Sequence, residues 1–155
     1  MYDENNIFAK ILRKEIPCDK VYEDEFSLFF NDINPQAKIH ILGIPKFPCT
    51  TFSDFLKNAN NENIISFFKS VQLVINNINI ENTGYRLISN SGEDGGQEVP
   101  HFHIHILGGE KIILGMSLEE FKSLSPTSSF GSAPHALKYL KETDDIEYLR
   151  NAFFK

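Results

Sequence analysis

The clearest pattern of hydrophobic and polar positions lies in residues 101–109, where three histidines alternate with large apolar side chains. Strict alternation is typical of a half-buried strand, because successive side chains of a strand point to opposite faces. We therefore expect His101, His103 and His105 on one face, about 6–7 Å apart along the strand. The apolar side chains between them would enter the core, and the two glycines that follow would end the strand.

Apolar residues at helical spacing predict two main helices. The first covers residues 7–14, with an asparagine before it as a cap, and Pro17 ends it because the residue before a proline avoids the helical region. The second covers residues 61–80 and has a broad apolar face, so we expect it to pack on a sheet, on a partner subunit or on both. A shorter helix is expected to begin near Ser53.

Four further segments are predicted to be strands: residues 20–23, 25–31, 38–46 and 85–91. The order α, β, β, β, α, β, β with mostly short connections favours an antiparallel sheet with the helices on one face, which is an α+β domain. We expect residues 1–112 to form this domain. Residues 113–155 would form a helical C-terminal extension, which either packs on the domain or acts as a lid or dimer arm.

Composition narrows the class of protein. The chain has 155 residues, 41% hydrophobic and 23% charged, which suits one globular domain. A formal net charge of −6 without a basic run argues against nucleic-acid binding by phosphate neutralisation. Cys18 and Cys49 form no metal or redox motif and are expected to be free thiols. Without a signal peptide or a membrane-length apolar run, a cytoplasmic protein with no membrane partner is expected.

The loop before the histidine strand contains adjacent glycines, Gly95 and Gly96. Adjacent glycines let backbone N–H groups converge on an anion, so this loop beside a row of imidazoles indicates chemistry at a phosphate. Simpler interpretations stay open: surface histidines, a plain glycine turn, or a zinc site, since neutral imidazole is a zinc ligand. Consecutive same-face side chains of a strand splay, which argues against zinc, and we expect no metal and no cofactor.

The pattern His-φ-His-φ-His-φ-φ of residues 101–107, with φ apolar, resembles the signature of the histidine triad (HIT) superfamily. Further segments resemble the histidine triad nucleotide-binding (HINT) branch: residues 7–17, 32–37, His40, 44–46, Asn90 and 95–97. The likeness runs from about residue 6 to Gly109. It implies a HIT-like fold, with a five-stranded antiparallel sheet, a long helix and a short N-terminal helix, and it implies a homodimer.

The resemblance also implies roles for single residues. His103 would be the nucleophile on the α-phosphate of a purine nucleotide conjugate, while His101 and His105 would orient it, contact phosphate oxygens and help to move protons. His40 would support this network. A neutral imidazole is a competent nucleophile near pH 7, so a nucleotidyl-histidine intermediate is chemically reasonable. The implied nucleotide-binding residues are Phe8, Ile11, Phe30, Asp32, Ile33, Asn90, Gly96, Gln97, Glu98 and Val99.

Some of these residues also have simpler interpretations. Asp32 stands before a turn, where aspartate usually bonds its own backbone, whereas the resemblance assigns it a ribose hydroxyl. His40 lies in an apolar strand and would be a core residue on the simplest interpretation. Phe8 and Ile11 would pack in the core in either case.

The implied activity is that of a nucleoside phosphoramidase-type hydrolase acting on AMP–amine conjugates. The alternatives are a dinucleoside polyphosphate hydrolase, a nucleotide-sensing interaction protein with weak activity, and a metal-binding protein. Glu98 and Pro100 depart from the residues that we expect in this branch. A carboxylate at position 98 would repel an anionic leaving group and favour an amine, so the departures concern the leaving group and not the reaction class.

Overall fold

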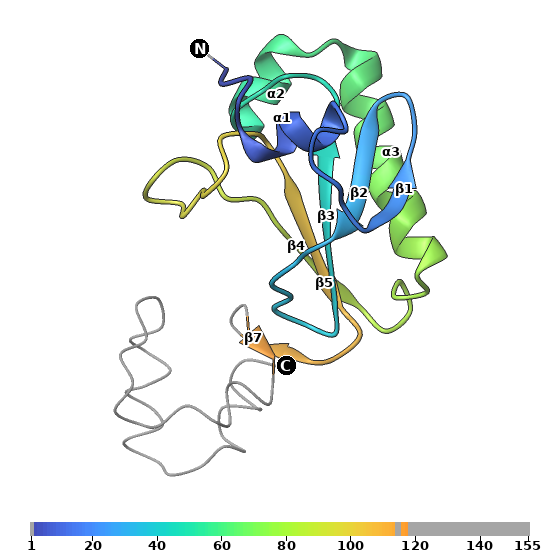
Figure 1. The fold of residues 1–155 in the computed structure, drawn as a ribbon. Helices are drawn as coiled ribbons and strands as arrows, with labels where there is room; N and C mark the ends of the chain where they lie inside the picture. Colours follow the sequence, from blue (N-terminus) through green and yellow to red (C-terminus); the bar gives the residue numbers. More distant parts are fainter. Residues whose placement is uncertain (1, 114–115, 118–155) are drawn as a thin grey trace, which may run out of the picture. The chain divides into compact units, whose positions relative to one another are not determined.

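A five-stranded antiparallel sheet is the centre of the fold (Figure 1). The computed structural model describes residues 2–113 and 116–117. The strands follow the order β1-β2-β3-β5-β4 across the sheet, which confirms the predicted sheet. Their bounds are β1 Lys20–Glu23, β2 Ser27–Asn31, β3 Ile39–Pro45, β4 Tyr85–Ile88 and β5 Ile104–Gly108.

Two short strands, β6 (Ile112–Ile113) and β7 (Met116–Ser117), form a separate two-stranded sheet. The helices that we expect after residue 117 lie outside the described residues. The division of the chain at residue 112 therefore stays a prediction.

Three helices accompany the large sheet, α1 (Ile7–Leu12), α2 (Phe52–Asn58) and α3 (Asn61–Asn77). Each begins at a polar cap, and the side chain of Asn6 accepts the N–H of Ala9 at 2.9 Å at the start of α1. Such caps satisfy N–H groups that have no partner within the helix. Both main helices end earlier than predicted, because Lys14 and Asn79 take positive φ angles of 63° and 58° just after them.

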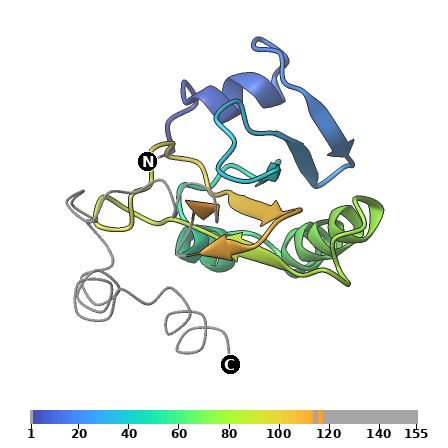
Figure 2. The same ribbon diagram turned by 90° about the horizontal axis from the view of Figure 1, so that it is seen from below.

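The helices cover both faces of the sheet, so the expectation that they share one face is wrong (Figure 2). Phe8 of α1 packs with Leu28, Phe30 and other side chains of one sheet face. Phe29 points to the other face and packs with the side chains of α2 and α3. All three of these β2 residues are at most 4% exposed. A strand that is apolar on both faces needs cover on both, and α1 provides it on the second face.

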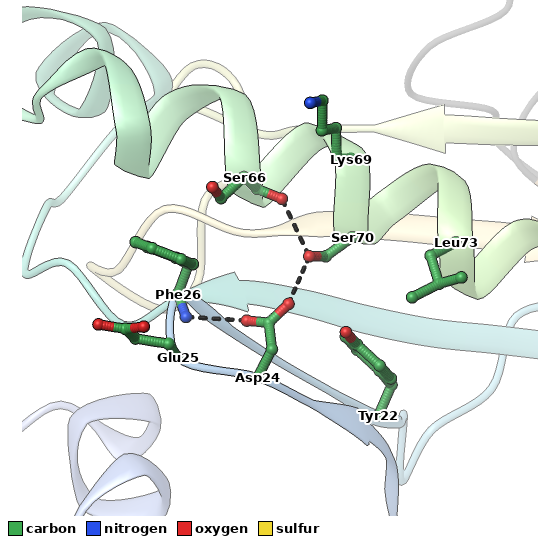
Figure 3. A pocket seen from close by; sticks show the side chains of 8 residues that line it. All are labelled: Tyr22, Asp24, Glu25, Phe26, Ser66, Lys69, Ser70 and Leu73. Carbon is green, nitrogen blue, oxygen red and sulfur yellow. Dashed lines mark hydrogen bonds between the residues drawn. The ribbon is translucent and has the colours of Figure 1, made fainter.

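The turn between β1 and β2 is fixed to α3 by Asp24 (Figure 3). One carboxylate oxygen accepts the N–H groups of Phe26 and Ser27 at 2.8 and 2.7 Å, and the other accepts the hydroxyl of Ser70 at 2.5 Å. An open hollow of about 350 Å³ lies beside this contact, lined by Tyr22, Asp24, Glu25, Phe26, Ser66, Lys69, Ser70 and Leu73. The contact ties the edge of the sheet to its covering helix.

Cys18 and Cys49 are free thiols, as expected. Burial raises the pKa of the Cys49 thiol to about 12, so this sulfur stays protonated and unreactive. Within residues 2–113 and 116–117, no helix is long and apolar enough to cross a membrane.

Candidate active site

Four histidines gather on the face of the sheet that α1 covers. His40 lies on β3 and His105 on β5, whereas His101 and His103 precede β5. The strand begins at Ile104, three residues later than predicted, because its pairing with β3 ends there. Even so, the ring centroids of His103 and His105 are only 4.9 Å apart. The alternation therefore predicted correctly that these two side chains share a face, although only one of them belongs to the strand.

His103 is held in the form that a nucleophile needs. Its Nδ1–H donates to the backbone carbonyl of His101 at 2.7 Å, which leaves the lone pair on Nε2. The residue is 5% exposed. Burial lowers its pKa, against smaller opposite effects that include the bond to His101. His103 is therefore neutral near pH 7 and presents an unprotonated nitrogen.

His101 supports this arrangement from a fully buried position. Its Nε2–H donates to the carbonyl of Pro45 at 3.0 Å, so its Nδ1 is the acceptor for the hydroxyl of Tyr2 at 2.5 Å. Burial lowers its pKa to about 4, so the ring is neutral. Both ring nitrogens are engaged within the protein. This geometry suits the expected orienting role of His101, whereas the expected contact with a phosphate oxygen would require one of these bonds to break.

His40 and His105 form a hydrogen-bonded pair. The backbone N–H of Gln36 donates to Nδ1 of His40 at 3.0 Å, so the proton of neutral His40 lies on Nε2. That Nε2–H points to Nδ1 of His105 at 2.9 Å and lies 3.3 Å from a carboxylate oxygen of Asp32. The remaining proton of His105 is therefore on its Nε2. Burial lowers the pKa of both rings, and that of His105 to about 4.

Asp32 has the simple role that its position before a turn suggested, and it also contacts His40. One carboxylate oxygen accepts the N–H of Asn34 at 2.8 Å, which closes the turn, and the other faces His40. Its side chain is 15% exposed. The ribose contact implied by the resemblance stays a prediction.

Asp32, His40 and His105 are also the residues of the described chain best placed to hold a metal, with one ligand atom each, all within 4.8 Å of one another. The tautomer of His40 opposes this role. Ligation through Nε2 would move its proton to Nδ1, where the N–H of Gln36 already points. Two donors would then face each other, which costs the free energy of a lost hydrogen bond. The chemistry of this donor set therefore favours a proton, and not zinc, between the two rings.

The apolar residues implied in nucleotide binding fall into two groups. Phe8, Ile11 and Phe30 are buried in one cluster with Val99 at its edge. The ring of Phe8 lies 5.1 Å from that of His103, centroid to centroid, so this cluster walls the histidines. In contrast, Ile33 is 90% exposed. An exposed Ile33 can line a pocket only through contact with a bound ligand, and its role stays a prediction.

Hydrogen bonds of Gln97 hold the loop of residues 90–99 together. The Gln97 side chain accepts the N–H of Gly92 at 3.0 Å and donates to the carbonyl of Thr50 at 2.6 Å. The N–H groups of Gly96 and Gln97 donate to carbonyls of the same loop at 2.9 and 3.0 Å. These two groups are thus already bonded and do not form the free anion cradle that we expected. Asn90 is half-buried and Glu98 is exposed.

Low histidine pKa values predict an acid-sensitive fold. His101 and His105 have pKa values of about 4 in the folded protein, against 6.5 as the ordinary value. Between these values the unfolded chain binds more protons, so stability falls as the pH drops from about 6.5 to about 4, by at most roughly 3 kcal/mol per histidine. Urea midpoints at about pH 7 and about pH 5 measure this effect. An unchanged or higher midpoint at pH 5 would contradict it.

Several groups of this site carry no signal in the sequence. Tyr2, the N–H of Gln36 and the carbonyl of Pro45 each fix a histidine tautomer. Backbone groups are present at every position, so no pattern of side chains marks the ones that matter. Tyr2 stands 99 residues from its partner His101, and only the folded chain brings them together.

The comparisons with known proteins agree with this geometry. Residues 13–112 match the HIT domain. The chain is 50% identical over 111 residues to an uncharacterized HIT-like protein of Azospirillum brasilense, a match that covers 72% of this chain and 91% of that protein. It is 44% identical over 110 residues to the purine nucleoside phosphoramidase of Escherichia coli K12, which covers 70% of this chain and 91% of that protein.

Solved structures give the same result. A HIT family hydrolase from Legionella pneumophila aligns with a TM-score of 0.66 and 37% sequence identity, over 71% of this chain and 97% of that chain. The domain match contains the whole sheet and all four histidines of the site. On these grounds the chain belongs to the HIT family.

Proposed function

We propose that this protein is a hydrolase that cleaves a purine nucleotide conjugate at its α-phosphate, with an AMP–amine phosphoramidate as the preferred class of substrate. The observation that carries the proposal is the state of His103. Its Nδ1–H is bonded to the carbonyl of His101, so a neutral Nε2 is available as a nucleophile. The 44% identity with a protein named purine nucleoside phosphoramidase supports the choice of substrate class.

The first step forms a bond between Nε2 of His103 and the α-phosphorus, while the bond from phosphorus to the amine nitrogen breaks. Positive charge then develops on the His103 ring. The carbonyl of His101 stabilises that charge through Nδ1–H, since a hydrogen bond to a charged donor is stronger than one to a neutral donor. This contact is therefore tighter in the intermediate than in the free enzyme, which is what catalysis requires.

The leaving amine must take up one proton as it departs. His105 carries its proton on Nε2 because Nδ1 accepts from His40, and its ring lies beside that of His103. The proton passes to the amine through this N–H, and the ring of His105 takes up a proton from solvent at the same time, so that it stays neutral. In the second step water attacks phosphorus and the bond to His103 breaks. AMP leaves with the oxygen of that water, and the proton that the water loses returns to solvent through His105. Glu98, which is exposed beside the site, favours an amine over an anionic leaving group.

We also propose that the protein is a homodimer that joins two sheets. The described sheet has two edges, β1 and β4. β1 is protected from pairing with a further strand by its irregular register and by charged side chains at both of its ends, Lys20 and Glu23. β4 instead exposes Tyr85 and Leu87, at 39% and 43%. Among the described residues, an edge strand with exposed apolar side chains favours pairing with a second strand.

The experiment that tests the activity measures AMP release from lysine joined to AMP, with and without EDTA. Metal-free nucleophilic catalysis predicts turnover that EDTA does not reduce. A dinucleoside polyphosphate, assayed in parallel, tests the alternative hydrolase. No turnover of the phosphoramidate, with AMP still bound, would refute the phosphoramidase proposal. Release of AMP from the dinucleotide alone would identify the alternative activity.

A further inference from the structure

We propose that Tyr2 is a positioning residue for His103 that acts through His101, an inference that rests on the proposed function. The phenol hydroxyl contacts Nδ1 of His101, and the carbonyl of the same residue holds the nucleophile. Tyr2 lies outside the segment matched to the HIT domain, which begins at residue 13. Its contribution would therefore belong to the N-terminal segment of this chain.

The N-terminal segment holds Tyr2 in place over the histidines. Asn6 donates to the carbonyl of Asp3 through its backbone and its side chain, at 3.2 and 2.6 Å, and its side chain also caps α1. Tyr2 directly precedes this bonded turn. The ring of Phe8, the second residue of α1, lies 6.2 and 5.1 Å from the rings of His101 and His103. The turn and the helix thus bring a phenol from the start of the chain onto His101.

The hydroxyl of Tyr2 completes the set of bonds that fixes His101. Because Nε2–H already donates to Pro45, the neutral ring can only accept at Nδ1, and the Tyr2 hydroxyl is the donor there. Burial raises the pKa of Tyr2, so the phenol keeps its proton. The fully buried His101 is therefore held at both edges in one tautomer. Its carbonyl, which accepts Nδ1–H of His103, is held with it.

Removal of this hydroxyl would leave Nδ1 of His101 as a buried acceptor without its donor. Such an atom gains by taking up a proton or by turning the ring. A proton on Nδ1 would put a positive charge beside His103 and reduce its tendency to attack. A turned ring would disturb the carbonyl that selects the tautomer of His103. Both changes act on the chemical step, since Tyr2 bonds His101 and not the substrate.

The test compares Tyr2→Phe with wild type in the full chain, using lysine joined to AMP as substrate. Phenylalanine keeps the edge contact between the aromatic ring and His101, whose centroids are 5.5 Å apart, and removes only the hydroxyl. We expect kcat to fall about tenfold, the effect of one buried bond, with KM changed less than about twofold. The acid limb of the pH profile of kcat should move to higher pH. Neutral His101 loses a stabilising hydrogen bond in this variant, so the pKa of its ring rises.

Tyr22→Phe is the matched control. Tyr22 is a partly buried phenol beside Asp24, on the hollow between β1 and α3, and its ring packs on Phe29 on the sheet face opposite the histidines (Figure 3). Loss of its hydroxyl should leave kcat and the pH profile unchanged. Thermal unfolding of both variants separates lost folding from lost catalysis, because a purely structural role would lower Tm without moving the acid limb.

Nitrogen NMR spectra of the histidine rings give a readout that needs no turnover. Wild type should show His101 with its proton on Nε2, and Tyr2→Phe should shift the Nδ1 signal and raise the pH at which His101 titrates. An unshifted acid limb or an unchanged kcat in Tyr2→Phe would overturn the inference. If wild type hydrolyses none of the substrates, the proposed function fails separately, and His101 signals unaffected by Tyr2→Phe would then overturn this inference as well.

Discussion

Replacement of His103 with alanine is expected to lower AMP release by ~10³-fold or more, because it removes the atom that we propose forms the covalent intermediate. Glutamine is the more informative substitution. Its side-chain amide can still donate to the carbonyl of His101, yet it has no nucleophilic nitrogen. His103→Gln should therefore be as inactive as His103→Ala. Steady-state release of AMP from lysine joined to AMP measures both variants.

Two further measurements separate loss of chemistry from loss of structure. Calorimetric binding of AMP should persist in His103→Gln, and its Tm should stay close to that of wild type, since the amide replaces a ring of similar volume. Mass spectrometry of rapidly quenched reactions should detect a nucleotidyl adduct in wild type and none in either variant. An adduct in His103→Gln, or residual turnover within about tenfold of wild type, would mean that another group attacks the phosphate.

The sequence predicted the sheet well because its strands alternate or are apolar on both faces. The registers of β2, β3 and β5 bring His40 and His105 together, which the separate patterns of residues 38–46 and 101–109 could only suggest. The start of β5 was misplaced because alternation reports an extended chain, whether or not a neighbouring strand pairs with it. Residues 101–103 lie beyond the paired stretch, and Phe102 bonds Cys49 instead.

The position of α1 was mispredicted for a related reason. The run Ser27-Leu28-Phe29-Phe30 has no polar member large enough to mark a solvent face, and all four residues are buried. Such a run requires cover on both faces of the sheet. A rule that assigns all helices to one face neglects this requirement. Placing α1 on the second face is what brings Phe8 against His103, so this difference in fold determines one wall of the site.

The histidines that gather at the candidate site could be predicted, but their protonation states could not. Motif spacing identifies four imidazoles, but it does not indicate which nitrogen of each ring carries a proton. In the structure that choice is made by a carbonyl for His103, by a backbone N–H for His40, and by a carbonyl and a distant phenol for His101. The histidines that we propose as nucleophile, relay and buried support therefore differ through partners that the motif does not contain.

The largest effect on stability is expected at Phe55, the aromatic residue of α2 that enters the core. Phe55 is fully buried, and its ring centroid lies 5.6 Å from that of Phe67 and 5.1 Å from that of Phe102. Phe55→Ala should lower the free energy of unfolding by about 3–5 kcal/mol, through lost transfer energy and the cavity left behind. Urea unfolding followed by circular dichroism measures the loss.

Phe52→Ala is the matched control, because it removes the same atoms from the same helix. Phe52 is 40% exposed and contacts the same Phe102 from outside, with centroids 5.7 Å apart. Its loss should cost about 1 kcal/mol, since less apolar area is buried than at Phe55 and no enclosed cavity is left. Equal losses in the two variants would show that α2 does not pack through Phe55.

A domain of this size is stable by only about 5–15 kcal/mol, so Phe55→Ala would leave little of the free energy of unfolding. Because Phe102 lies between His101 and His103, the packing that Phe55 provides also sets the position of His103, the proposed nucleophile.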